Sequence, residues 1–324
     1  RRASKANRIG TFTSACGQTV YTGGRFSSPY EGAYFVCEPV NNLVHSDRLI
    51  PLGATYEAKR HMPEQEFLAS TDLWFKPVST TTGPDGALYV VDFYRKIVEH
   101  PEFIRKDYID AHELFSQGRD MGRIYRVVHE EQGLSDRTPN LTNAASRTLV
   151  DELSNPNRWW RITAQRLLID RRDTSVVPAL EKLAREGSSA VGRMHALWTL
   201  EGLDVLDADL IIHGLDDEGP LVREQAVRLA EDHLSDDSVS NALIRMVDDS
   251  DFRVQFQVAC TLGGLPFEEA FPALQEIAFA HLNDSWFRTA VLTSAAETAP
   301  QWFRTVLQRD LSPDDQEGAR AFVR

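Results

Sequence analysis

The residues that could carry chemistry lie within the first 100 positions, mostly at the ends of strand-like runs. They are Glu38, His45, Lys76, Asp92, Arg95, Glu99 and His100. Histidine exchanges a proton near neutral pH, so His45 and His100 are candidate proton acceptors. Arginine and lysine bind carboxylates, and the planar guanidinium does so through two parallel hydrogen bonds. Arg95 and Lys76 are the members of this set that could bind an anion.

Each of these residues also has a structural interpretation. Glu38 precedes a proline and can cap a turn, and Asp92 can accept hydrogen bonds from neighbouring amides. His100 precedes Pro101 in a stretch that reads as a surface loop. Charged residues at strand ends are common, so the set indicates a site only if its loops meet at one place.

The three cysteines suggest a structural role rather than a metal site. Cys16 and Cys37 fall in the neighbouring strand-like runs Phe12–Tyr21 and Ala33–Glu38. If those strands pair, a disulfide can form, which would indicate an oxidising compartment. Cys260 lies on the apolar side of a helical pattern, and we expect it to be a small buried hydrophobe. The cysteine and histidine spacings match no zinc-site pattern.

The first domain, residues 1–128, reads as β-structure. Runs rich in Val, Tyr, Phe and Thr alternate with turn residues. The runs are Phe12–Tyr21, Ala33–Glu38, Leu43–Ile50, Phe67–Ser70, Pro77–Thr82, Ala87–Phe93 and Gly122–Val128. Residues 83–86, Gly-Pro-Asp-Gly, predict a tight hairpin, since proline presets φ and glycine accepts a positive φ. Lys96–Asp120 is charged and less regular. The polar, turn-rich residues 129–143 predict a linker.

Residues 144–324 repeat one helical phrase. Aligned on its second residue, the phrase occurs at Arg161, Arg193, Arg223, Gln255 and Arg288, and a truncated sixth copy is centred on Arg320. The first five are separated by 32, 30, 32 and 33 residues. This period, with two apolar-faced helices in each unit, predicts a HEAT-like α-solenoid of about five repeats. Such scaffolds expose an extended concave surface that binds proteins or polymers.

The recurrent arginine of the repeat has two interpretations. A row of guanidinium groups can hold an anionic ligand. We favour a structural role, in which each arginine pairs with the acidic turns of an adjacent unit, such as Asp216–Glu218 or Asp248–Asp251. Those turns are themselves expected to supply helix N-caps. The recurrent tryptophans are expected to pack between repeats rather than to form a ligand cage. They are Trp159, Trp160, Trp198, Trp286 and Trp302.

Charge and hydropathy narrow the class of partner. The formal net charge of −13 argues against nucleic acid as the main partner, because phosphate binding needs clustered Lys and Arg. No apolar run is long enough to cross a bilayer. The chain opens with Arg1-Arg2-Ala3-Ser4-Lys5 and stops within a repeat, so we expect it to be a piece of a longer polypeptide.

Several phrases of the strand-rich half are similar to known proteins. Trp74–Val78, followed by Gly83–Asp92, resembles blades of six-bladed propellers related to soluble quinoprotein glucose and sorbosone dehydrogenases. Other phrases resemble more closely a family of large, secreted, membrane-bound dehydrogenase-like proteins of bacteria. These phrases are Thr13–Gly17, Phe35–Pro39, Asn42–His45, Tyr94-Arg95, Glu99–Pro101 and Gly122–Tyr125. In that family a propeller precedes HEAT-type repeats and frequently a c-type cytochrome module, so the resemblance covers nearly the whole chain.

The resemblance implies a multidomain β + α protein, with a partial β-propeller followed by an α-α superhelix. In the intact protein it implies oxidation of a sugar or alcohol, with hydride passing to pyrroloquinoline quinone and electrons to a cytochrome. Arg95 and Lys76 would hold the carboxylates of the quinone, although the family phrase has arginine where this chain has Lys76. The implied location is the bacterial periplasm or another extracytoplasmic compartment.

Two departures from the family limit this reading. The strands amount to about two blades, and a closed propeller needs more. The CxxCH motif of a c-type haem does not occur in the chain. We therefore expect a C-terminal fragment that is inactive by itself. The alternative is a non-catalytic propeller and HEAT scaffold that binds a protein or polysaccharide, and a cytosolic scaffold would leave Cys16 and Cys37 as free thiols.

Overall fold

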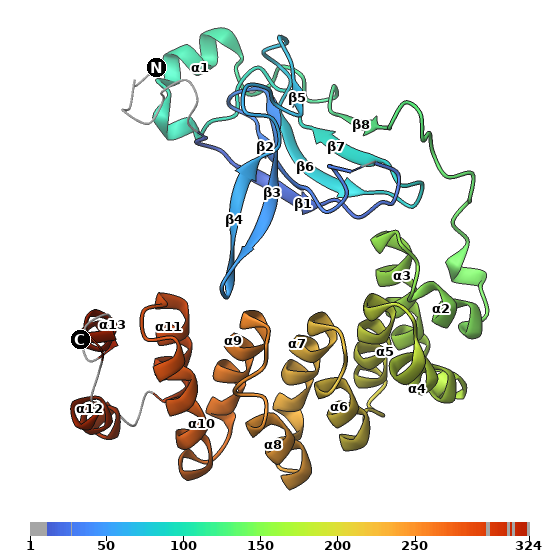
Figure 1. The fold of residues 1–324 in the computed structure, drawn as a ribbon. Helices are drawn as coiled ribbons and strands as arrows, with labels where there is room; N and C mark the ends of the chain where they lie inside the picture. Colours follow the sequence, from blue (N-terminus) through green and yellow to red (C-terminus); the bar gives the residue numbers. More distant parts are fainter. Residues whose placement is uncertain (1–11, 27, 296–298, 310–311, 313–314, 323–324) are drawn as a thin grey trace. The chain divides into compact units, whose positions relative to one another are not determined.

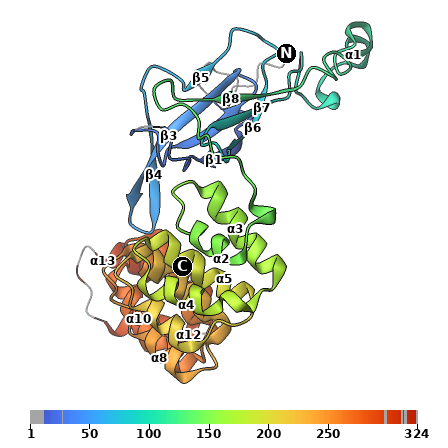
Figure 2. The ribbon, with the colours of Figure 1, turned by 90° about the vertical axis from the view of Figure 1, so that its right-hand side faces the viewer.

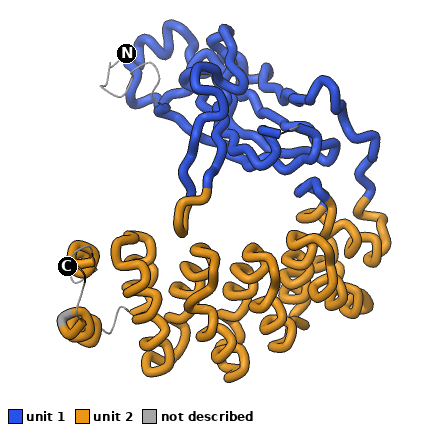
Figure 3. The backbone as a smooth tube through the Cα atoms, viewed as in Figure 1, with its two compact units in different colours: residues 1–50, 56–140, 156–160 blue, residues 51–55, 141–155, 161–324 orange. Residues whose placement is uncertain are grey.

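The computed structural model describes residues 12–26, 28–295, 299–309, 312 and 315–322. These residues form two compact units (Figure 3). The first, the strand unit, takes the residues up to Ile50 together with Tyr56–Asn140 and Pro156–Trp160. The second, the helical unit, takes Pro51–Thr55, Leu141–Asn155 and the residues from Arg161 onward. The strand-rich half and the helical half expected from the sequence are thus present.

The strand unit contains two sheets (Figure 1). In the larger sheet the order is β1 (Cys16–Val20), β2 (Tyr34–Glu38), β3 (Leu43–Leu52) and β4 (Thr55–Arg60), and β5 (Leu68–Ala69) pairs with β3. The smaller sheet has the order β6 (Pro77–Thr82), β7 (Leu88–Asp92) and β8 (Arg123–Val127). Both sheets are open, so the described residues do not form a closed propeller.

The hairpin expected at residues 83–86 is confirmed. The amide of Gly83 donates to the carbonyl of Ala87 at 2.9 Å, and Thr82 lies opposite Leu88 in the β6–β7 register. Gly86 has a φ of 84°, in the left-handed region that a Cβ disfavours. Along β7 buried residues alternate with half-buried ones, so Leu88 and Val90 enter the core of the strand unit.

The two sheets contact each other through backbone. The hydroxyl of Thr80 on β6 donates to the carbonyl of Gly17 on β1 at 2.7 Å. A Cβ on Gly17 would collide with the carbonyl of Val78 and the backbone of Ser79, and the φ of Gly17 is 57°. Glycine is therefore required here for two reasons, a left-handed backbone and a close approach of two strands.

The stretch between β7 and β8 is irregular, as expected from its charge. It contains a 3₁₀ turn, Pro101–Phe103, and one short helix, α1 (Lys106–His112), that buries none of its own residues. Helix α1 lies outside the two sheets (Figure 2). Residues 128–140, which follow β8, contain turns but neither strand nor helix.

The helical unit is built of helix pairs. The first helices of the pairs are α2 (Ser146–Glu152), α4 (Val177–Glu186), α6 (Ala208–Leu215), α8 (Asp237–Ile244), α10 (Phe267–Ala280) and α12 (Ala299–Gln308). The second helices are α3 (Arg158–Arg171), α5 (Ala190–Gly202), α7 (Pro220–Leu229), α9 (Phe252–Thr261), α11 (Ser285–Ser294) and α13 (Asp315–Phe322). All six aligned positions of the repeated phrase fall in second helices.

Neighbouring pairs stack through like helices (Figure 1). Helices α5, α7, α9 and α11 contact one another in order and form the second-helix layer, which α3 begins. The first-helix layer contains α4, α6, α8 and α10. The apolar side of each helix is buried between neighbours, as Leu200, Val227 and Val258 are, so one continuous core runs through the stack.

The expectation that the acidic turns supply N-caps is confirmed for residues 248–251, where Asp251 caps α9. It was wrong for residues 216–218, because the N-cap of α7 is Gly219, which makes no side-chain cap. Asp207, Asp251 and Asp284 each accept a hydrogen bond from a backbone amide in the first turn of α6, α9 or α11. The bond from the amide of Leu210 to Asp207 measures 2.9 Å. A cap of this kind satisfies a donor that has no partner within the helix.

The prediction that Cys260 is buried was wrong. The side chain is exposed on α9. The buried stripe of this helix runs through Val254, Val258 and Thr261, at spacings of three and four residues. Cys260 lies to one side of that stripe, which the apolar character of cysteine alone could not reveal.

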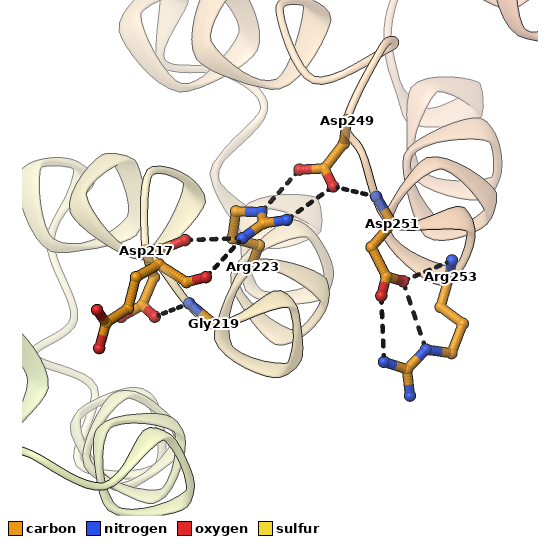
Figure 4. A network of polar contacts seen from close by, with 7 residues as sticks. Asp217, Gly219, Arg223, Asp249, Asp251 and Arg253 are labelled. Carbon is orange, nitrogen blue, oxygen red and sulfur yellow. Dashed lines mark hydrogen bonds and ion pairs between the residues drawn. The ribbon is translucent and has the colours of Figure 1, made fainter. Parts of the chain in front are cut away.

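In two repeats the repeated arginine ties its helix pair to the next pair. Arg193 on α5 donates to both carboxylate oxygens of Asp217 at 2.7 Å, and Arg223 on α7 does the same to Asp249 at 2.7 and 2.9 Å. Figure 4 shows Arg223 between Asp217 and Asp249. The structural role that we favoured for the arginine row, pairing with acidic turns of adjacent units, is confirmed for these two repeats.

The same arginines also close the turn within their own pair. Arg161, Arg193, Arg223 and Arg288 each donate to the carbonyl six residues earlier. For Arg193 that carbonyl belongs to Gly187, the residue that ends α4. Carbonyls near the C-terminus of a helix lack partners within the helix, and in these four pairs the guanidinium satisfies one of them.

We predict that Arg193→Ala lowers the free energy of unfolding by about 3–5 kcal/mol, because it leaves the buried carboxylate of Asp217 unpaired. The side chains of this pair are only 5% and 4% exposed. The matched control is Arg185→Ala, whose partner Asp209 is 80% exposed, and it should change stability by less than about 1 kcal/mol. Urea unfolding followed by circular dichroism measures both, and equal effects would contradict the structural role.

Candidate functional site

His45 lies on β3 between two carboxylates. Its Nδ1 is 2.5 Å from Oε2 of Glu66, and its Nε2 is 3.0 Å from Oδ1 of Asp47. Arg60 on β4 forms an ion pair with the same Glu66. The imidazole is buried and the ring of Phe12 meets it edge-on. Both ring nitrogens are therefore engaged within the sheet, in an arrangement that fastens β3 and β4 to the segment before β5.

Lys76 and Asp92 are neighbours at one end of the smaller sheet. Oδ1 of Asp92 accepts hydrogen bonds from the amide of Lys76 at 2.8 Å and from the amide of Tyr94 at 2.9 Å. The Nζ of Lys76 donates to the carbonyl of Leu73 at 2.6 Å. Burial lowers the pKa of Lys76, although the nearby carboxylates of Asp72 and Asp92 oppose this shift. Both side chains hold backbone in place.

Arg95 closes the loop that carries α1. Its guanidinium donates to the carbonyls of Gly118 and Arg119 at the far end of that loop, the second at 3.1 Å. It also contacts the carbonyls of Phe93 and Tyr94 beside it, both at 3.2 Å. These bonds join the end of β7 to the segment before β8. That Arg95 and Lys76 hold the carboxylates of a quinone remains a prediction.

The remaining candidates lie in different places. Glu38 is buried at the end of β2, where it accepts a hydrogen bond from the amide of Ser14 at 3.0 Å. Glu99 and His100 are exposed on the loop before α1, and Glu99 accepts from the amide of His100 at 2.9 Å. The structure thus groups Lys76, Asp92 and Arg95 and leaves the other candidates on other segments. Among the described residues, no group of His, Cys, Asp and Glu side chains has a metal-binding arrangement.

Sequence reasoning missed a cluster beside Lys76. The hydroxyl of Tyr94 donates to Asp72 at 2.9 Å, and the guanidinium of Arg123 lies 3.8 Å from the centre of the Tyr94 ring. The amide of Trp74 and the hydroxyl of Tyr94 lower the pKa of Asp72. These residues lie up to 51 positions apart in the sequence, so no local pattern could have grouped them. Of these residues, only Trp74, which precedes the Phe75-Lys76 phrase, could have been singled out from the sequence.

Polar side chains link neighbouring helices along the second-helix layer. Nδ1 of His195 on α5 lies 2.6 Å from the side-chain oxygen of Gln165 on α3. The indole of Trp198 on α5 donates to Gln225 on α7 at 3.1 Å. Arg228 on α7 continues the series by donating to Gln257 on α9 at 2.9 Å. These links lie beside the ion pairs and give the layer a continuous polar seam.

His281, the residue after the last residue of α10, makes a similar polar link to α9. Its Nε2 lies 2.6 Å from the side-chain oxygen of Gln255, and its ring stacks on Phe287 with a centroid separation of 3.9 Å. Burial lowers the pKa of His281, while the carboxylate of Asp284 acts in the opposite direction. The imidazole is therefore held in its neutral form against an aromatic ring.

The second-helix layer also exposes apolar and aromatic side chains. Phe252, the first residue of α9, is 50% exposed, and Trp286, in the first turn of α11, is 54% exposed. The expectation that Trp286 packs between repeats was wrong, because the buried stripe of α11 runs through Phe287, Ala290 and Val291. Ile162 and Ile169 on α3 line a hollow of about 250 Å³. Another hollow, of about 310 Å³, lies between α2 and α4. Both are open to solvent, whereas pockets for small ligands enclose most of the ligand surface.

Negative charge is concentrated in the C-terminal part of the chain. Residues 141–324 contain 18 Lys and Arg against 30 Asp and Glu, whereas residues 1–140 contain 17 against 18. Nearly all of the net charge of −13 therefore belongs to residues 141–324. A surface of this sign attracts cationic partners and repels anionic ones.

Comparison with known proteins gives two matches to family models. Residues 1–131 match a domain of unknown function, DUF7133, and residues 208–296 match HEAT repeats. No curated protein matches the chain. The expectation of HEAT-type repeats is confirmed over 208–296, a range that begins with α6 and includes α11. Within the described residues, no helix is both long enough and apolar enough to span a membrane.

We predict that Arg95→Lys loosens the junction between residues 93–95 and 118–119, because lysine keeps the charge but loses the forked contacts. Hydrogen bonds from charged groups contribute about 1.5–3 kcal/mol, so amide exchange near Met121 should rise roughly tenfold or more. Hydrogen exchange with mass spectrometry measures this. Arg105→Lys, in the exposed pair with Asp107, is the control. Unchanged exchange in Arg95→Lys would show that the contacts do not hold the loop.

We predict that acidification below pH 6.5, the ordinary pKa of histidine, destabilises the helical unit through His281. The folded pKa is the lower one, so on acidification the unfolded chain binds a proton before the folded chain does. The stabilisation that depends on neutral His281 is therefore fully present above pH 6.5 and is lost as the pH falls below that value. His281→Gln should show a shallower decline of unfolding free energy over this range. Urea unfolding gives the unfolding free energy of both proteins at each pH, and their difference at pH 7.5 is subtracted. If the two free energies then fall equally with pH, His281 is not the group responsible.

Proposed function

We propose that this chain is a binding scaffold whose second-helix layer takes up a protein with a positively charged surface. The observation that carries the proposal is the layer itself, α3 to α11, which is tied at its repeat junctions by ion pairs and polar links. A surface held rigid in this way loses little conformational entropy when a partner binds. Stacked helical repeats commonly use such an extended surface for protein recognition.

The chemistry of the surface agrees with a protein partner. Large exposed aromatic side chains, Phe252 and Trp286, are the residue types that dominate protein interfaces. The excess of acidic residues in positions 141–324 favours a cationic partner over an anionic one. The open hollows favour a broad contact over a small molecule.

Three of the candidate site residues, His45, Lys76 and Arg95, favour structural roles over catalysis in this chain. Both nitrogens of His45 face carboxylates within the sheet, and Arg95 and Lys76 hold backbone carbonyls. A general base or a ligand clamp must offer an atom to the substrate. These side chains are already committed to other atoms of the strand unit, which is the pattern of structural residues.

A second candidate applies to a longer polypeptide. The four-strand order of the larger sheet, and the close contact of β1 with β6 at Gly17, favour two neighbouring blades of a propeller. On this proposal further blades complete a quinoprotein-type dehydrogenase for a sugar or alcohol, with a c-type cytochrome as electron acceptor. Titrating a longer protein with pyrroloquinoline quinone, with dye reduction as readout, tests it. If the longer protein neither binds the quinone nor reduces the dye, only the scaffold proposal stands.

We predict that Trp286→Ala weakens partner binding at least tenfold, as loss of a central aromatic contact does. A photoreactive residue at position 286 would first identify the partner in extracts of the source organism. Its dissociation constant would then be measured by calorimetry with purified proteins, at two salt concentrations. A cationic partner should bind more weakly at the higher one.

Phe303→Ala is the matched control. Phe303 is an exposed aromatic residue of similar exposure, 50%, but it lies on α12, a first helix. Binding to this variant should stay within about twofold of the unmodified chain, since a rim or remote contact contributes little. If Phe303→Ala weakened partner binding as much as Trp286→Ala does, the partner would not bind specifically to the second-helix layer.

A further inference from the structure

Cys16 and Cys37 are direct partners across two neighbouring strands. They lie opposite each other in the antiparallel pairing of β1 with β2, at the end of the ladder where the register shifts between Cys16 and Thr19. Side chains of directly opposed residues point to the same face of a sheet. The two thiols therefore face one another, although both are present as free cysteines.

The backbone geometry already suits a disulfide. Directly opposed residues in an antiparallel pair have Cα atoms about 4.5 or 5.5 Å apart, depending on their place in the hydrogen-bond ladder. Disulfides bridge Cα separations of about 4.4–6.8 Å. Either kind of pair falls in this range, so the strands need not move for a bond to form.

The two thiols differ in access. Cys37 is fully buried in the core of the strand unit with Phe35 and Val44, whereas Cys16 packs against the edge of that core and is partly exposed. Burial raises the pKa of Cys37 to about 12, with a smaller contribution from the adjacent Cys16. Burial and then the carboxylate of Glu38 also raise the pKa of Cys16. Cys16 is therefore the thiol that an external reagent can reach.

We propose that Cys16 and Cys37 form a reversible dithiol–disulfide couple that is oxidised by a small-molecule disulfide. The proposal does not rest on the binding function above. It assigns a redox modification site to the strand unit, with Cys16 as the entering thiol and Cys37 as the resolving thiol.

The exchange takes place in two steps. Cys16, as thiolate, attacks one sulfur of the reagent, so that one mixed disulfide bond forms and the reagent's disulfide breaks, releasing one thiol. Cys37 then gives up its proton and attacks the sulfur of Cys16, which forms the Cys16–Cys37 bond and releases the second thiol. Two protein thiols are thus oxidised, and one reagent disulfide is reduced to two thiols.

Oxidation would staple β1 to β2. The bond closes the chain across Gly17–Val36, including Gly17, whose carbonyl joins β1 to Thr80 of the smaller sheet. A crosslink that removes freedom from the unfolded chain stabilises the folded state. Oxidation therefore stabilises the strand unit without changing its fold.

The test uses the full chain with Cys260→Ser, because exposed Cys260 would otherwise react between molecules. The folded protein is incubated with oxidised glutathione, and thiols are counted after unfolding. The expected result is a fall from two thiols to none in a monomer, with a Cys16–Cys37 crosslinked peptide in the mass spectrum. The melting temperature of the strand unit should rise by roughly 5–10 °C, and dithiothreitol should reverse both changes.

Three outcomes would overturn the proposal. Two thiols that remain after incubation would show that the pair does not oxidise in the folded protein. A glutathione adduct that persists on Cys16 would show that Cys37 cannot resolve it. Disulfide-linked dimers would show that Cys16 reacts between chains.

A charge variant tests the order of the steps. Glu38→Gln removes the carboxylate that opposes ionisation of Cys16 and should speed oxidation several-fold at a given pH. Cys37→Ala, which keeps Cys16, should stop at the glutathione adduct, whereas Cys16→Ser should not react. Should Cys37→Ala fail to fold, the rate change in Glu38→Gln still tests the role of Cys16, and an unchanged rate would contradict it.

Discussion

An arginine in the first turn of a second helix bonds to two groups at once, a carbonyl of its own pair and a carboxylate of the next turn. In the clearest case Arg193 donates to the carbonyl of Gly187, at the end of the preceding helix, and to both carboxylate oxygens of Asp217 in the next turn. The first contact fixes the turn within a pair, and the second fixes the distance to the following pair. A single side chain thus sets the geometry of a repeat and of its junction, and the polar seam of the second-helix layer follows from that spacing.

The row of arginines along the second helices has one exception. The fourth repeat has Gln255 where the others have arginine, and there His281 contacts the glutamine side chain. A neutral hydrogen bond and a stacked ring take the place of an ion pair. The junction is therefore sensitive to pH in a way that the arginine junctions are not, since a guanidinium stays charged throughout the physiological range.

The strand unit uses its charged residues in the same way as the helical unit. Asp92 holds two amides, Lys76 holds a carbonyl, and Arg95 joins the two ends of the loop that carries α1. Each had been a candidate for ligand binding because its type suits that chemistry. The type of a residue does not show whether its hydrogen-bonding groups are free, because backbone groups compete for them. Asp92, Lys76 and Arg95 bond to backbone groups here, and their roles toward a ligand remain a prediction.

Both kinds of architecture could be predicted from the residues alone, because periodic patterns and turn residues act locally. Seven strands lie on runs read from composition, and all six second helices lie on the repeated phrase. Strand β4 was missed, because its residues are mostly exposed and charged and it is a strand only through pairing with β3. Three facts could be learned only from the folded chain: which thiols face each other, that Cys260 is exposed, and that His45 lies between Glu66 and Asp47. Those facts depend on register and on contacts between distant segments, about which a local pattern carries no information.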